Sequence, residues 1–214
     1  MSMFVELSAT SNFTFLNGAS HPEEYIARAA LLGLPALAIA DENSVAGIVR
    51  AHSEVRKIKR LVEECSKADH FGPPKPAHVP TPPSAQILNV PRLLPAALLR
   101  FEEGIGLTAL PQTRTGWASL CRILSRGRLR AQKGECHLRV SDLLDMGKDL
   151  QLLLHSPYTL TSKRGVGAWV TQAHRLTRRF ATNMHLLMTP VYDGQDATRF
   201  EEIAKLGQSL QLPL

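Results

Sequence analysis

The sequence predicts an α/β fold, and three observations lead to that prediction. Short apolar segments alternate with longer ones in which apolar residues recur every three or four positions, as strands alternate with helices. The apolar share of 44% and the charged share of 21% are ordinary for a folded domain. No apolar run approaches the roughly 20 residues of a membrane-spanning helix.

The first 65 residues predict a strand, a helix, a strand and a helix in that order. Residues 4–9 alternate apolar and polar side chains, whereas residues 34–40 are apolar throughout, as in a strand covered on both faces. Between them, Ser20 can cap a helix and Glu23 can complete the capping box. The second helix, residues 43–65, carries an apolar stripe at positions 45, 48, 49, 52, 55, 58 and 62. This order implies parallel strands in a layered or barrel fold.

A proline-rich stretch, residues 66–92, interrupts this alternation, and we interpret it as a linker or insertion. We therefore divide the chain into a first half of the fold, 1–65, the linker, 66–92, and the remainder, 93–214. The closing residues, 210–214, resemble the approach to a further strand, so we expect the fold to be incomplete at its C-terminus. In the remainder, the pattern predicts strands at 93–101, 105–111, 150–155 and 184–190, and helices at 117–127, 140–147, 165–180 and 196–210.

Positive charge is concentrated in one part of the chain. The formal net charge is +6, and the stretch from Arg114 to Arg139 alone holds seven cations and one acid. A second stretch, 163–179, holds five cations and no acid. Clustered cations suit a polyanion such as DNA, although a solvated basic face would look the same in sequence. The candidate contacts to DNA or to a neighbouring domain are Arg122, Arg126, Arg128, Arg130 and Lys133.

The sequence lacks the short motifs of several enzyme classes. It has no glycine-rich phosphate loop, no G-x-S-x-G nucleophile motif and no closely spaced histidine pair. Its three widely spaced cysteines suit reduced thiols, so we expect a cytoplasmic protein. Asp41 is the most suggestive acid, because it ends a buried strand where ligands gather in parallel α/β folds. Alternatively, Asp41 or Asn43 caps the helix that follows.

These residues together resemble a known family. The segment FVELSATSNFTFLNGASHPEEYIARAALLGLPALAIADENSVAGIVRAH is similar to the N-terminal PHP (polymerase and histidinol phosphatase) domain of bacterial C-family DNA polymerases. The resemblance is closer to the error-prone branch used in damage tolerance, and it continues through LLPAALLRFEEG, LPQTRTGWASLCRILSRGRLRAQKGECHL and VSDLL. It implies a distorted PHP-like (β/α)7 barrel, here incomplete at its C-terminus.

The resemblance also implies where a metal site would lie. Metal-binding members hold a trinuclear site with an H-x-H pair on the first strand, a later acid, a D-H pair on the second strand and a glutamate in the next helix. Only Asp41 keeps the family identity, and we expect a vestigial pocket without ions in which Arg50 pairs with Asp41 or Glu42. The vestigial positions are Ser8, Thr10, Asn17, Asp41, Glu42 and Arg50.

The resemblance implies a structural N-terminal domain of an error-prone, DNA-directed DNA polymerase that acts in DNA repair and translesion synthesis. It implies no cofactor in this chain, Mg²⁺ in the palm domain of the full-length polymerase, and DNA and the rest of the polymerase as partners. A sliding clamp and damage-tolerance accessory proteins are further partners implied by the family. Two alternatives stay open, namely a free-standing metal-dependent phosphoesterase and a non-catalytic fragment that binds DNA or a polymerase.

Overall fold

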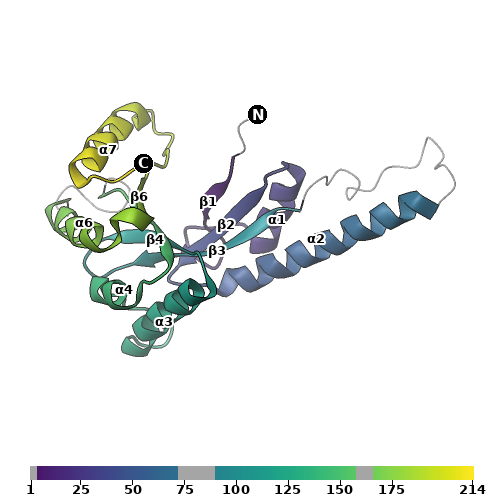
Figure 1. The fold of residues 1–214 in the computed structure, drawn as a ribbon, viewed down its shortest axis with the longest axis horizontal. Coiled ribbons are helices and arrows are strands. Elements are labelled where there is room, and N and C mark those ends of the chain that lie inside the picture. The colour runs from purple at the N-terminus through teal and green to yellow at the C-terminus, as the bar shows by residue number, and fades with distance from the viewer. Residues whose placement is uncertain (1–3, 72–89, 158–165) are drawn as a thin grey trace. The chain divides into compact units, whose positions relative to one another are not determined.

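The structure, a computed structural model of the 214-residue chain, describes residues 4–71, 90–157 and 166–214. It separates into two compact units, Met1–Pro95 and Ala96–Leu214. Strands and helices alternate in both units (Figure 1), so the predicted α/β class is confirmed. Most of the proline-rich stretch lies outside the described residues, and the division at 66–92 stays a prediction.

The first unit follows the predicted order of strand, helix, strand and helix. Strands β1 and β2 pair in parallel, with Ala9 opposite Ile39, because α1 forms the crossover between them. The C-terminal ends of both strands therefore meet at one edge. The bounds of the elements are β1 (Glu6–Ala9), α1 (Pro22–Leu31), β2 (Ala36–Glu42) and α2 (Ala46–Phe71).

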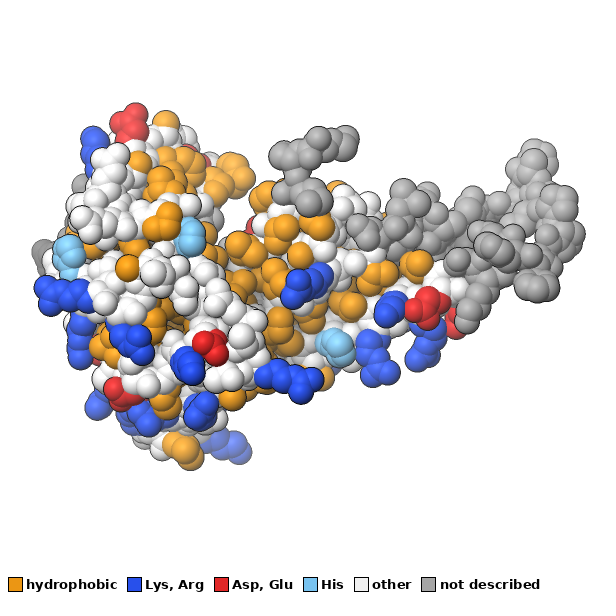
Figure 2. All heavy atoms as spheres, viewed as in Figure 1, with side chains coloured by type: hydrophobic (Ala, Val, Ile, Leu, Met, Phe, Trp, Pro, Cys, Tyr) orange, Lys and Arg blue, Asp and Glu red, His pale blue; other side chains and the backbone are white. Residues whose placement is uncertain are grey.

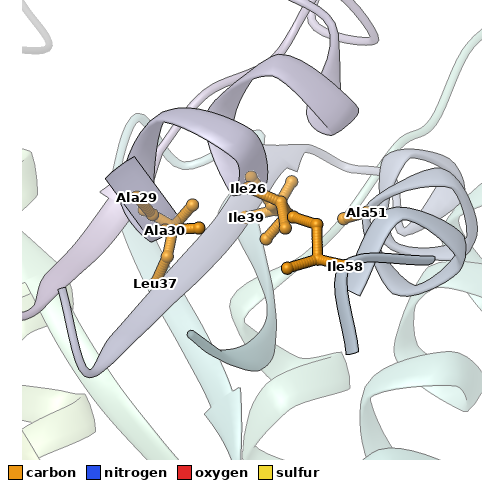
Figure 3. Packing of buried hydrophobic residues seen from close by; sticks show 7 residues of the cluster. All are labelled: Ile26, Ala29, Ala30, Leu37, Ile39, Ala51 and Ile58. Carbon is orange, nitrogen blue, oxygen red and sulfur yellow. The ribbon is translucent and has the colours of Figure 1, made fainter. Parts of the chain in front are cut away.

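The core of the first unit is built from small and branched side chains (Figure 3). Helices α1 and α2 pack directly against each other and against β2, and alanines at the contacts let the backbones approach closely. This packing fixes where β2 ends and hence where its last side chains lie. The buried members of the cluster are Ile26, Ala29, Ala30, Leu37, Ile39, Ala51 and Ile58.

Two local predictions for this unit are wrong in detail. The N-cap of α1 is His21 rather than Ser20, and Glu24 rather than Glu23 accepts a hydrogen bond from the cap N–H at 2.7 Å. In α2, Val49 is 70% exposed and His52 is exposed, whereas Ala51 is fully buried. The buried stripe of α2 is therefore narrower than the apolar pattern predicted.

The second unit begins within β3 and pairs its strands in two directions. Strands β3 and β4 form the predicted hairpin, β4 and β5 are also antiparallel, and β5 and β6 are parallel. Helices α3 and α4 lie in the connection between β4 and β5. The bounds are β3 (Arg92–Arg100), β4 (Gly106–Pro111), α3 (Arg114–Arg130), α4 (Val140–Met146), β5 (Leu150–His155), α6 (Val166–Phe180), the 3-10 helix η3 (Ala181–Asn183), β6 (Met184–Leu187) and α7 (Asp196–Leu210).

The C-terminal residues run beside β6. The backbone N–H of Leu186 donates to the carbonyl of Pro213 at 2.8 Å, and Leu212 is buried. The residues predicted to approach a further strand thus contact the last strand of this unit. None of the helices in the described ranges combines the length and the apolar character needed to cross a membrane.

A buried ion pair holds α3 to α4. Asp142 is 2% exposed, and Arg130 binds both of its carboxylate oxygens, at 2.9 and 3.0 Å. The backbone N–H of Arg139 also donates to Asp142, and Arg126 lies 3.6 Å from the same carboxylate. Burial raises the pKa of Asp142, but the hydrogen bonds from Arg130 and Arg139 outweigh it and lower the net pKa. Asp142 is therefore held as a carboxylate.

A partly buried histidine ends β5. The His155 ring lies 2.8 Å, Nε2 to Oγ1, from Thr108 on β4, and its carbonyl accepts from the indole N–H of Trp169. Burial, and secondly the charge of Arg100, lowers the pKa of His155 to about 4. The imidazole is therefore neutral at pH 7.

We predict that Arg130→Met destabilises the second unit by about 3 kcal/mol, because it leaves a buried carboxylate without its main partner. Both tryptophans, Trp117 and Trp169, belong to this unit, so urea unfolding followed by tryptophan fluorescence measures the change. The control is Arg122→Met on the exposed face of the same helix, with an expected effect below about 0.5 kcal/mol. Equal effects of the two variants would contradict a structural role for the ion pair.

We predict that the second unit loses stability as the pH falls from about 6.5 to about 4. In this window the unfolded chain protonates His155 and the folded chain does not, so acid favours unfolding, by about 2 kcal/mol at pH 5 relative to pH 7.5. The His155→Gln variant can still bond to Thr108 and should show a smaller loss over the same window. An NMR titration placing the His155 pKa near 6.5 in the folded protein would contradict this prediction.

Candidate functional site

The first candidate site is the C-terminal end of β2, where Asp41 is only 1% exposed. The backbone N–H of Ser11 donates to Asp41 Oδ1 at 2.8 Å, and the Ser11 hydroxyl lies 2.9 Å from both carboxylate oxygens. The Thr14 hydroxyl donates to Oδ1 at 3.2 Å and accepts from the backbone N–H of Glu42 at 2.8 Å. The carboxylate is therefore compensated by an N–H and two hydroxyls from the loop after β1.

The space around Asp41 is closely filled. A Cβ atom on Gly47, in the first turn of α2, would lie 2.4 Å from Asp41 Oδ2, and one on Gly18 would lie 2.1 Å from the carbonyl oxygen of Ser11. The first turn of a helix favours a negative charge, so α2 also stabilises the carboxylate. Asp41 does not cap α2 as the alternative interpretation supposed, because that helix begins five residues later at Ala46.

The other predicted metal positions make contacts of their own. The backbone N–H and hydroxyl of Ser8 lie 2.8 and 3.0 Å from Glu6 Oε1. The carbonyl of Thr10 accepts from the Tyr25 hydroxyl at 3.1 Å, and Asn17 is exposed in the loop. The residues that bond to Asp41 are Ser11 and Thr14, neither of which was predicted from the sequence.

Arg50 lies beside Glu23 and Phe13, whereas we expected it to pair with Asp41 or Glu42. Its guanidinium lies 3.7 Å from Glu23 on α1 and 5.8 Å from the centroid of the Phe13 ring. Its side chain is 55% exposed. Ser11 and Thr14 already donate to the Asp41 carboxylate, which is 1% exposed.

Within the described ranges, no group of three or more His, Cys, Asp or Glu side chains is arranged to hold a metal ion. Ser11, although it bonds to a carboxylate, is fully buried, so its hydroxyl has no access to a substrate. The arrangement as it stands is a set of hydrogen bonds that closes the loop onto the strand. The signal that could have identified it is a pair of hydroxyl residues three positions apart, just after a strand that neighbours a buried aspartate.

The second candidate site is the basic segment around α3. Arg130 and Arg126 point to the acids of α4, and Arg126 also lies 3.7 Å from Asp145. Arg122 is exposed and donates to the carbonyl of Ala118 one turn earlier, and Arg128 and Lys133 are exposed as well. The structure thus divides the predicted contacts into cations that hold α3 to α4 and cations that face outward.

The comparisons with known proteins identify the family that the chain resembles. The PHP domain family matches residues 6–158. An error-prone DNA polymerase from Rhodopseudomonas palustris strain BisB5 is 34% identical over 98% of this chain and 16% of its own length. An error-prone DNA polymerase from Ruegeria pomeroyi is 36% identical over 99% of this chain and 19% of its own length. The chain therefore spans less than a fifth of each of these two relatives.

Two solved structures share the fold at low sequence identity. One is a putative metal-dependent phosphoesterase from Bifidobacterium adolescentis, with a TM-score of 0.51 and 11% identity over 97% of this chain and 84% of that one. The other is an amidohydrolase from Chromobacterium violaceum with bound sulfate and no metal, with a TM-score of 0.50 and 13% identity over 95% of this chain and 84% of that one. These fold relatives are consistent with a partial PHP barrel. Because the family match covers most of the sequence, the chain belongs to the PHP domain family.

Proposed function

We propose that this chain is a structural PHP domain of an error-prone, DNA-directed DNA polymerase that acts in translesion synthesis, and that it holds no hydrolytic metal ions. Similarity over nearly its full length to a segment of error-prone DNA polymerases supports the first part. The hydrogen bonding of Asp41 carries the second part.

The side chains at the metal positions do not fit a transition-metal centre. Zinc and manganese sites use imidazole, thiolate and carboxylate ligands, whereas Ser8, Thr10 and Asn17 supply hydroxyl and amide groups. The one family acid that remains, Asp41, accepts three donors from Ser11 and Thr14. An ion would have to displace these donors from a closely packed, buried position.

In this proposal the domain contributes shape rather than catalysis. DNA and the rest of a polymerase chain are its partners, and Mg²⁺ would serve nucleotide transfer in a palm domain outside these 214 residues. The free-standing phosphoesterase is the weaker alternative, because the fold relative that bears that description is only 11% identical.

The proposal predicts that the purified chain contains only substoichiometric zinc, manganese and iron. A chelator should leave its melting temperature unchanged, and added Zn²⁺ or Mn²⁺ should not raise it, because a ligand stabilises only a fold that it binds. Mass spectrometry of the metal content and thermal melts measure both effects. Two or more tightly held transition ions per chain, or phosphoester hydrolysis that both a chelator and Asp41→Ala abolish, would instead identify a phosphoesterase.

We further predict that Asp41→Ala lowers the free energy of unfolding of the first unit by about 3 kcal/mol, because it leaves buried donors on Ser11 and Thr14 unpaired. Amide exchange at Ser11 should accelerate, since its N–H loses its acceptor. The control, Glu23→Ala, removes the partly exposed pair with Arg50 and should cost less than about 1 kcal/mol. If Asp41→Ala destabilised the chain only in the presence of a transition metal, an ion rather than the hydroxyls would be the partner.

A further inference from the structure

Lys and Arg side chains gather over α3, α4 and α6 on the face shown in Figure 2. Helix α4 packs against both α3 and α6, so the three helices form one layer of the second unit. Neither α3 nor α6 contains an acidic residue. We call five exposed cations of this layer the α3–α6 basic face, namely Arg122, Lys133 just after α3, Arg175, Arg178 and Arg179; Arg114 and Arg128 of α3 are exposed as well.

The acids of this layer are already paired. Asp142 binds Arg130, and Asp145 lies 3.7 Å from Arg126, so we assign these two cations to the acids of α4, although the Arg126 side chain stays 47% exposed. Arg122, Lys133, Arg175 and Arg178 are exposed, and Arg179 lies 5.4 Å from the Phe180 ring while remaining exposed. Lys163 and Arg164 lie outside the described residues. A positive surface is left that is balanced neither by α4 nor by acids on its own helices.

The C-terminal turn of α6 offers a simpler explanation for part of this charge. Arg178 and Arg179 lie in its last turn, where cations are favoured by the helix dipole. That effect does not apply to Arg175, which lies earlier in α6, or to Arg122 in the middle of α3. The face therefore carries more positive charge than helix stability requires.

The spacing of the helices distinguishes a polymer from a small anion. Packed helices lie about 8–10 Å apart, so α3 and α6, with α4 between them, are separated by roughly 20 Å. A single phosphate cannot bridge that span, whereas successive phosphates of a duplex can contact both helices at once.

We propose that the α3–α6 basic face binds the phosphodiester backbone of duplex DNA without regard to base sequence. This proposal rests on the charge distribution of the second unit and does not depend on the metal content of the first. Arginine suits the role because its planar guanidinium donates two hydrogen bonds to one phosphate.

The test is fluorescence anisotropy of the full 214-residue chain with a labelled DNA duplex over a range of salt concentrations. Two double variants, Arg122→Glu with Lys133→Glu and Arg175→Glu with Arg178→Glu, should each weaken binding at least tenfold at low salt. Each should also reduce the slope of log affinity against log salt by about 2, as expected for two lost phosphate contacts. Thermal melts check that both variants stay folded.

The matched control makes the same change in charge on α2, in the other unit, with Arg56→Glu and Arg60→Glu. It should weaken binding less than threefold. A wild-type chain that does not bind duplex, or a control that weakens binding as much as the test variants, would overturn the proposal. Tighter binding to polyglutamate than to duplex at equal salt would overturn it in favour of an acidic protein partner. Single-stranded DNA of the same length should bind with a smaller salt slope.

Discussion

The burial of Asp41 is the constraint on which the first unit depends. A carboxylate that is 1% exposed must find donors, and here the loop after β1 supplies them through Ser11 and Thr14. Those bonds fix the loop, and the fixed loop in turn holds Phe13 beside Arg50. In metal-binding relatives, cations would be expected to compensate the same charge. Here one N–H and two hydroxyl groups, none of them charged, donate to the carboxylate.

The second unit meets the same requirement in a different way. Asp142 is as deeply buried as Asp41, but a guanidinium with two parallel hydrogen bonds compensates it. A charged partner must itself be partly desolvated, and Arg130 achieves this while its side chain stays 27% exposed. Arg130, which is among the candidate DNA contacts predicted from the sequence, therefore helps to hold α3 against α4.

Most of the elements could be predicted from the sequence because they depend on local periodicity. The apolar run of β2 and the hairpin of β3 and β4 are confirmed. The cap of α1 is displaced by one residue because Pro22 occupies the first helical position and leaves His21 as the cap. The partners of Asp41 could not be predicted, since they lie 27 and 30 residues away and the pairing depends on the parallel register of β1 and β2. That Ser8 and Thr10 carry hydroxyl groups where the family resemblance implies imidazole could be read from the sequence alone.

The number of cations in a stretch of sequence does not give the charge of the surface that the folded stretch presents. The stretch from Arg114 to Arg139 has as much net charge as the whole sequence, yet its cations are not equivalent in the fold. Arg130 binds the buried Asp142, Arg126 lies 3.6 Å from the same carboxylate while its side chain stays 47% exposed, and Arg139 donates to Glu102. Arg175 and Arg178 are distant in sequence from this stretch. They lie on α6, and both α3 and α6 contact α4. An electrostatic surface is therefore defined by the cations that remain after the buried acids have been paired, and folding brings in others from a separate part of the chain.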